Sequence, residues 1–343
     1  MGFVFPTPAA RRAACSSVAA ASAAIMFAAM MFAAVIFAGA AHALGFDHIS
    51  HTQKSLNQRD HDQASHEIQS RENGRRNDPA KDQSPARAEA RYIANEGILI
   101  RAGETKILFD PLFHESYGNY LTPSLETYRA IMDGAPPYDG VDAIFISHAH
   151  GDHFSASDAN AYLAKHGTVR LVAPQQAVDM MRAAEGWNEA LTARIIALDL
   201  AIGDPGRYIN SVKANAGEAS LTVYAVRIPH AGWPGRADVQ NMVYRVTLEG
   251  AATVMHMGDA DPLDDHYAPY ADEWAARRTD TAFPPYWFFL SEAGVEILDK
   301  RLNVEDAVGV HVPKVAPNDL IETGRAFFSE PGEIRAIGGA EQD

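Results

Sequence analysis

The chain has 343 residues, of which 47% are apolar and 21% charged, and its formal net charge is −15. This composition is typical of a globular protein with a sizeable core. The acidity argues against nucleic acid or an anionic membrane surface as the main partner, because phosphate binding needs clustered Lys and Arg. The single cysteine, Cys15, lies in an N-terminal apolar segment. Any metal bound by the rest of the chain must therefore be held by His, Asp or Glu.

Residues 1–43 have the pattern of a secretory signal peptide. Arg11 and Arg12 precede an uncharged run over 13–41, and the segment closes with the small-x-small sequence Ala41-His42-Ala43. The pattern predicts export to the periplasm or cell envelope. Because the apolar run is long enough to span a bilayer, an uncleaved N-terminal anchor that keeps the protein near the membrane is the alternative.

Residues 44–90 form a polar tract with few large apolar side chains, which predicts a disordered linker. We expect the folded domain to cover 91–337. Its patterns predict helices at 157–165 and 175–185, and strands at 93–100, 106–110, 141–146, 169–173, 220–228, 242–248, 253–257 and 308–312. Strands with intervening helices, several of them in hairpins, indicate two sheets sandwiched between helices.

Polar side chains that could bind metal follow directly after these strands. They are Asp110, a cluster that begins at His148, His230, Asp259 and, within the last short strand, His311. Ligands held at strand ends can converge on one edge of a sheet sandwich, where rigid elements fix them and substrate can reach them.

The cluster is the run His148-Ala149-His150-Gly151-Asp152-His153. Four donors within six residues can face one small volume if the loop is short, and Ala149 and Gly151 supply small spacers. A lone histidine would usually be structural, but four donors at this spacing indicate a metal site. Imidazole and carboxylate together suit zinc or a similar first-row metal.

In these residues the chain resembles the metallo-β-lactamase superfamily, whose signature is H-x-H-x-D-H. The resemblance covers 92–316 and includes five elements in order: Asp110 in FDP, the run at 148–153, His230 in IPH, Asp259 in MGD and His311 in VHV. It implies an α/β protein with the four-layer αββα fold, and a metal-dependent hydrolase with two divalent cations. Zinc is the expected metal, with iron and manganese as alternatives.

The resemblance also implies roles for single residues. His148, His150 and His230 would hold the first metal, while Asp152, His153 and His311 would hold the second. Asp259 would bridge the two metals, and a hydroxide shared between them would be the nucleophile. Asp152 would also orient this nucleophile, and Asp110 would orient a ligand histidine.

Three features of the candidate ligands exclude other branches of the superfamily. The exported region has no cysteine, which excludes the antibiotic-degrading branch with a cysteine ligand. Asp259 supplies the bridging carboxylate that the cysteine-free antibiotic-degrading branch lacks, and His150 stands where flavodiiron proteins have Glu. The segments NEGILI and ILFDPLF look most like the branch of ascorbate-6-phosphate lactonase and N-acyl phosphatidylethanolamine phospholipase D. We therefore expect cleavage of an ester, lactone or phosphodiester bond in a small molecule or lipid. The alternative is a non-catalytic metal-binding or sensor module on the same fold.

Other residues are candidates for the pocket beside the metals. His114 lies near Asp110 in the sequence, and Tyr286 and Trp287 belong to the aromatic segment TAFPPYWFFL. This segment predicts a pocket wall or a lipid-contacting lip, with core packing or a subunit contact as the alternative. The sequence does not fix the oligomeric state.

Overall fold

The computed structural model describes residues 88–213, 220–248 and 250–338. The predicted signal peptide and all but the end of the predicted linker lie outside this range. The described residues fall within one compact unit of the chain. None of the helices in this part of the chain is long and apolar enough to cross a membrane.

The first sheet has seven strands in the order β13-β1-β2-β3-β4-β5-β6. Its N-terminal strands pair antiparallel as a meander, whereas β3 to β6 run parallel. The strands are β1 (Glu89–Ala94), β2 (Gly97–Ala102), β3 (Thr105–Phe109), β4 (Ala143–Phe145), β5 (Arg170–Pro174), β6 (Ile195–Leu198) and β13 (Ile334–Ala336).

The second sheet has six strands in the order β12-β11-β10-β9-β8-β7. Strands β7 to β10 pair antiparallel, and β10 to β12 run parallel. The strands are β7 (Arg207–Lys213), β8 (Ser220–Arg227), β9 (Met242–Leu248), β10 (Ala252–His256), β11 (Thr279–Phe283) and β12 (Val304–Ala307).

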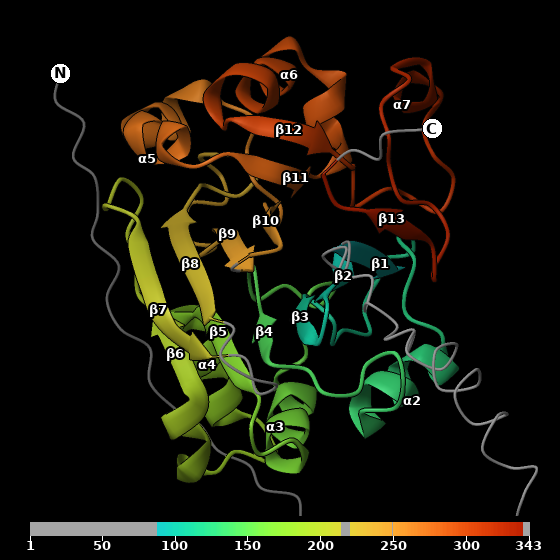
Figure 1. Cartoon of the computed structure of the whole chain (residues 1–343), viewed down its shortest axis with the longest axis vertical. Helices are drawn as coiled ribbons and strands as arrows, with labels where there is room; N and C mark the ends of the chain where they lie inside the picture. Colours follow the sequence, from blue (N-terminus) through green and yellow to red (C-terminus); the bar gives the residue numbers. More distant parts are fainter. Residues whose placement is uncertain (1–87, 214–219, 249, 339–343) are drawn as a thin grey trace, which may run out of the picture. The chain divides into compact units, whose positions relative to one another are not determined.

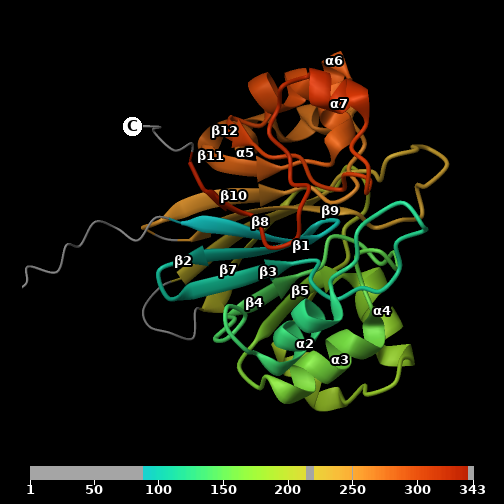
Figure 2. The ribbon, with the colours of Figure 1, turned by 90° about the vertical axis from the view of Figure 1, so that its right-hand side faces the viewer.

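Helices cover the outer face of each sheet (Figures 1 and 2). The first sheet is covered by α2 (Leu125–Asp133), α3 (Ala156–Lys165), α4 (Gln175–Ala183) and the 3-10 helix η1 (Glu189–Arg194). The second is covered by α5 (Ala271–Ala276), α6 (Glu292–Glu296), α7 (Asn318–Glu322), the 3-10 helices η2 (Asp264–His266), η3 (Ala268–Tyr270) and η4 (Tyr286–Leu290), and the π-helical turn η5 (Ile297–Arg301). The layers are therefore helix, sheet, sheet and helix, as the resemblance implies.

Alternation along the strands produces three apolar cores. In β3, Ile107 and Phe109 enter the core between the two sheets, while Leu108 between them faces the helices of the first layer. The side chains of a strand point to opposite faces in turn, so a strand buried on both sides is apolar throughout. On the outer face of the second sheet, Trp274 and Phe288 belong to a third core. The two sheets are thus held together by apolar side chains up to the edge where the metal-binding candidates lie.

Two of the predicted strands are wrong. The strand expected at 93–100 is two strands, β1 and β2, separated by a turn at Asn95 and Glu96, where Asn95 has a φ of 47°. The strand expected at 308–312 lies earlier, at β12, and 308–312 forms only isolated bridges such as Val310 to Pro285. In both places local backbone geometry interrupts an apolar run that the sequence pattern reads as continuous.

Candidate metal centre

The run at 148–153 lies in the loop between β4 and α3, and the second sheet holds this loop in place. The Tyr244 hydroxyl of β9 donates to the Ile146 carbonyl at 2.8 Å, and the Met242 amide donates to the Ser147 carbonyl at 2.9 Å. The side chains of this loop thus face the loops that follow β8 and β10 of the other sheet.

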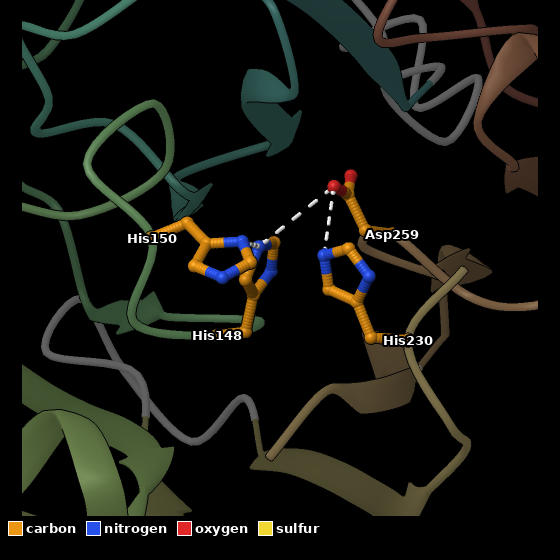
Figure 3. A group of neighbouring side chains, drawn as sticks. All are labelled: His148, His150, His230 and Asp259. Atoms are coloured by element: carbon orange, nitrogen blue, oxygen red, sulfur yellow. Dashed lines mark hydrogen bonds and ion pairs between the residues drawn. The ribbon is translucent and has the colours of Figure 1, made fainter. Parts of the chain in front are cut away.

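The first group of donors comprises His148, His150, His230 and Asp259, whose candidate ligand atoms all lie within 4.8 Å of one another (Figure 3). His230 Nε2 lies 3.1 Å from Asp259 Oδ2, and His148 Nε2 lies 3.9 Å from the same oxygen. His148 Nε2 and His150 Nδ1 are 3.0 Å apart. The group joins the loop after β4 to the loops after β8 and β10.

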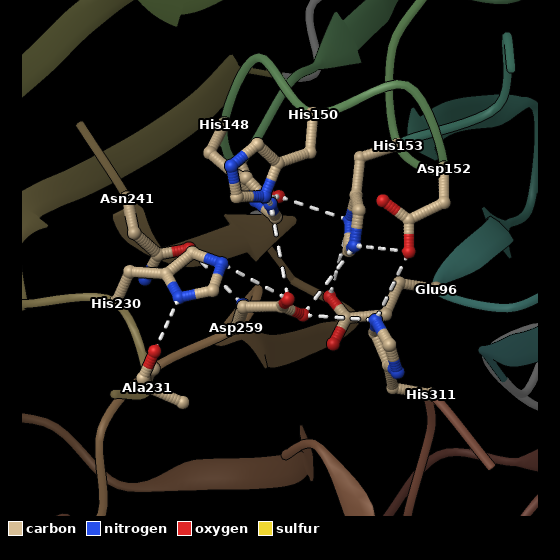
Figure 4. Close-up of polar contacts among 12 residues, drawn as sticks. Glu96, His148, His150, Asp152, His153, His230, Ala231, Asn241, Asp259 and His311 are labelled. Atoms are coloured by element: carbon tan, nitrogen blue, oxygen red, sulfur yellow. Dashed lines mark hydrogen bonds and ion pairs between the residues drawn. The ribbon is translucent and has the colours of Figure 1, made fainter. Parts of the chain in front are cut away.

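The second group comprises Asp152, His153 and His311, again within 4.8 Å of one another (Figure 4). Asp152 Oδ2 lies 3.4 Å from His311 Nε2 and 3.7 Å from His153 Nε2. All three side chains are buried. His311 has a φ of 57°, so it is part of a turn and not of the strand in which the sequence analysis placed it.

The Asp259 carboxylate lies between the two groups and presents one oxygen to each. Oδ2 faces His148 and His230, as described above. Oδ1 lies 3.4 Å from His153 Nε2 and 3.2 Å from His311 Nε2. This is the arrangement of a carboxylate that is shared between two positions.

Several of these atoms are buried without a hydrogen-bond partner in the described part of the chain. They are the Nε2 atoms of His153, His230 and His311 and the Oδ1 atom of Asp259. Buried polar atoms normally have a partner, and a group of orphaned ones that face each other needs a ligand. Two atoms bound to one tetrahedral zinc would be roughly 3.4 Å apart. The observed spacings and the imidazole and carboxylate donors therefore fit a metal at each group.

Hydrogen bonds fix the other ring nitrogen of His153 and of His230. His153 Nδ1 donates to Asp110 Oδ2 at 2.9 Å, and His230 Nδ1 donates to the Ala231 carbonyl at 2.7 Å. A neutral imidazole with its proton on Nδ1 has a lone pair on Nε2, which is the form that binds a metal. Asp110 is itself held by the Ser147 amide at 2.7 Å and by the Ser147 hydroxyl at 2.5 Å.

Asp259 is positioned by a turn that requires glycine. Gly258 has a φ of 55°, and a Cβ there would lie 2.4 Å from Asn241 Oδ1 and 2.7 Å from the Ser147 Cβ. Asn241 Oδ1 accepts from the Asp259 amide at 3.0 Å. The close packing of this turn against Ser147 brings the bridging candidate next to the loop that carries the histidine run.

The structure adds two site residues that the sequence analysis missed, Asn95 and Glu96. The side-chain Nδ2 of Asn95 donates to the Asp152 backbone carbonyl at 3.0 Å, and the Asn95 backbone carbonyl accepts from the His311 backbone amide at 3.0 Å. Glu96 is fully buried beside His153, and neither carboxylate oxygen has a hydrogen-bond partner among the described residues. The sequence Asn95-Glu96-Gly97 is typical of a turn, but the sequence analysis placed it in the middle of a strand.

Burial and neighbouring charges shift the pKa values of several site residues. Burial lowers the pKa of His148 well below its usual value, which keeps this imidazole neutral, as a metal ligand must be. Burial raises the pKa of Glu96 well above its usual value, against the attraction of His153. For Asp259, burial is outweighed by His311 and His153, which hold the pKa of this carboxyl well below its usual range.

A cavity of about 650 Å³ opens over both groups. Its lining combines candidate ligands with side chains of two loops: Tyr117, Asn119, Tyr120, His150, Asp152, Gly235, Arg236, Asp238, Val239, Asp259 and His311. The Tyr120 ring packs edge-on against His311 with 4.1 Å between ring centroids. The site is thus buried on one side and open to a small ligand on the other.

The residues predicted to line the pocket, His114, Tyr286 and Trp287, occupy different positions relative to the cavity. His114 does not line this cavity; it is exposed and lies 2.5 Å from Asp158 of α3. Trp287 packs on His311 with ring centroids 5.3 Å apart, and its Nε1 donates to the Ala260 carbonyl at 3.0 Å. Tyr286 packs against Trp287 and does not reach the cavity. The aromatic segment therefore supports a candidate ligand from behind and continues into the third core.

The sequence model of the beta-lactamase superfamily domain matches residues 105–286, which is more than half of the chain. No curated protein matches.

Among solved structures, a metallo hydrolase from the archaeon Ignicoccus hospitalis is 16% identical, with a TM-score of 0.48 over 74% of this chain and 99% of that one. An isothiocyanate hydrolase from Delia radicum gut bacteria is 15% identical, with a TM-score of 0.47 over 73% and 100%. The diiron β-hydroxylase CmlA from Streptomyces venezuelae is 12% identical, with a TM-score of 0.38 over 66% and 45%. On the match of the family model, this chain belongs to the metallo-β-lactamase superfamily.

Proposed function

We propose that this protein is a dinuclear-metal hydrolase of the cell envelope that cleaves an ester, lactone or phosphodiester bond in a small molecule or lipid. The position of Asp259 carries the proposal. Each of its carboxylate oxygens lies within 3.4 Å of an orphaned imidazole nitrogen, and the two oxygens face different groups of donors.

The first metal would be held by His148, His150 and His230, the second by Asp152, His153 and His311, with Asp259 shared between them. When bound, a pair of divalent cations supplies a hydroxide nucleophile near neutral pH and polarises the oxygen of the scissile bond. Zinc is the metal we expect, and iron and manganese suit the same donors.

The residues of the chain prepare this chemistry in three ways. Asp110 and the Ala231 carbonyl keep the protons of His153 and His230 on Nδ1, away from the cavity. The side chain of Asn95 donates to the backbone carbonyl of Asp152 and fixes this residue. The Asp152 side chain therefore stays in the lining of the cavity, where it can orient the nucleophile. Burial of the opposite side excludes water from the back of the site.

Metal analysis coupled to a substrate screen tests the proposal. The purified protein is stripped with chelator, reloaded with zinc, iron or manganese, and assayed with generic esters, lactones and phosphodiesters. We expect two metals per chain and turnover of one class that chelation abolishes. Normal hydrolysis by metal-free protein would exclude the mechanism. Full metal occupancy with no turnover of any class would favour the sensor module instead.

The cellular location has its own test. N-terminal sequencing of the exported protein should find Leu44 as the first residue if the signal is cleaved. An intact N-terminus in the membrane fraction would support the uncleaved anchor and a substrate at the lipid surface.

A further inference from the structure

One wall of the cavity is formed by the loop between β8 and β9, which carries a basic side chain. Arg236 is the one Lys or Arg among the described residues that line the cavity. The cavity is also lined by Tyr117 and Asn119 of another loop, and by Gly235 and Asp238 of the same loop as Arg236. The substrate space therefore contains a cation that the proposed hydrolytic chemistry does not use.

Arg236 has no acidic partner in the described part of the chain within the 4.0 Å that defines an ion pair. Its Cγ and Cδ pack beside Gly232, where a Cβ would lie 3.8 and 3.6 Å from them, so the aliphatic stem rests on the loop. Half-buried Arg301 and Arg325 are paired, with Asp264 at 2.6 Å and with Asp299 at 2.9 Å, whereas exposed Arg129, Arg207 and Arg277 resemble Arg236 in having no ion pair among the described residues; Arg236 differs from these three in lining the cavity. The guanidinium of Arg236 is therefore free to bind an external anion that enters the cavity.

The other charges around the cavity favour the same kind of ligand. Asp152 and Asp259 lie at the floor, where two bound divalent cations would more than neutralise them. Asp238 is the remaining carboxylate of the lining, and it is exposed on the same loop as Arg236. A cavity with a positive floor and a guanidinium in its wall attracts anions.

We propose that Arg236 determines specificity by binding a carboxylate or phosphate group of an anionic substrate, whose scissile bond lies over the metal-binding residues. This inference rests on the proposed hydrolase function and narrows its substrate class. The guanidinium presents a planar fork of N–H donors that matches both oxyanions. Because Arg236 is exposed, its contribution should be modest, about fivefold in affinity.

Binding of matched acids tests the inference without requiring turnover. Hexanoate and adipate have the same carbon chain and both can place a carboxylate at the metals, but only adipate has a second one. A series from succinate to suberate allows for the unknown span, and the ω-phosphonate analogue of hexanoate tests phosphate-like groups. Their dissociation constants are measured by calorimetry on zinc-loaded protein. The variants are Arg236→Gln, Arg236→Lys and, as a control for loss of surface charge, Arg129→Gln on α2, which does not line the cavity.

We expect the best dianion to bind the parent protein about fivefold more tightly than hexanoate. Arg236→Gln should abolish this preference and leave hexanoate binding unchanged, Arg236→Lys should retain part of it, and Arg129→Gln should retain all of it. A parent protein with no preference, or an Arg236→Gln variant that keeps it, would overturn the inference. A protein that shows the preference but hydrolyses no ester, lactone or phosphodiester would instead refute the hydrolase and leave the anion site standing.

Discussion

Replacing Asp110 by Asn tests whether the support behind the second group of donors determines metal binding. The Asp110 carboxylate is fully buried and accepts three hydrogen bonds, from the Ser147 amide, the Ser147 hydroxyl and His153 Nδ1. Asn has the same shape, but its amide nitrogen can accept none of them. At least one donor is therefore left unsatisfied, and the bonds that remain lose the assistance of a charge. We expect a loss of about 2–4 kcal/mol in the free energy of unfolding.

The same change should weaken binding of the metal that we propose for Asp152, His153 and His311. Without the carboxylate, no negative charge holds the proton on His153 Nδ1, and loss of such a partner typically lowers metal affinity about 10–100-fold. Urea unfolding of metal-free protein measures the first effect, and competition with a chromophoric chelator measures the second. Asp280→Asn is the matched control, because Asp280 Oδ2 accepts from the Thr253 amide at 2.7 Å in β10, outside both groups of donors. The control should lose stability and keep both metals; an Asp110→Asn variant that also binds two metals with parental affinity would refute the reasoning.

Four further outcomes follow from the same geometry. Chelation should lower the melting temperature by roughly 10 °C, since a ligand at about a thousand times its Kd contributes about 4 kcal/mol; scanning fluorimetry with zinc added back measures this, and an unchanged transition would speak against metals in the fold. Asp259→Ala should bind at most one metal and lose turnover, whereas two metals by elemental analysis would exclude its bridging role. Glu96→Gln should stabilise metal-free protein increasingly as the pH rises above about 4.5. Burial raises the pKa of the Glu96 carboxyl in the folded state, so its ionisation opposes folding of the parent protein. Equal unfolding curves of variant and parent at pH 7 would contradict this. Gly258→Ala should cost about 1–3 kcal/mol and reduce metal content together, because its φ is 55° and its Cβ would contact Asn241; a variant as stable as the parent would show that the turn relaxes freely.

Much of the site could be predicted because its donors are tied to a short motif and to strand ends. The run His148 to His153 is nearly contiguous, so its convergence needs only one loop. His230 and Asp259 each lie three residues beyond the end of a strand, β8 and β10, and the sequence predicts both strands. The packing of the two sheets brings the strand ends at one edge of the sandwich together. The order of these residues along the chain was therefore enough to predict that they lie in one site.

The missed residues lie where tertiary contacts decide the backbone. Asn95 and Glu96 sit in a tight turn within a run of apolar residues, and a single asparagine at positive φ is a weak signal for it. The turn is fixed by bonds to Asp152 and to the backbone of His311, which are far away in the sequence. Local patterns cannot report such bonds, and the same reason explains why the segment at 308–312 was read as a strand.

The donors come from loops of both sheets, so metals bound there would have a structural role as well as the proposed chemical one. The run at 148–153 follows β4 of the first sheet, whereas His230 and Asp259 follow β8 and β10 of the second, and His311 lies beyond β12. Each group of donors thus includes residues from both sheets, and Asp259 touches both groups. Metals at these positions would join the two sheets at one edge of the sandwich, where the apolar core between them ends. Loss of metal should therefore open that edge first, and hydrogen exchange in metal-free protein should rise at the loops after β4 and β10 before it rises in the β2–β3 hairpin; uniform protection in both regions would show that the apolar core alone holds the edge closed.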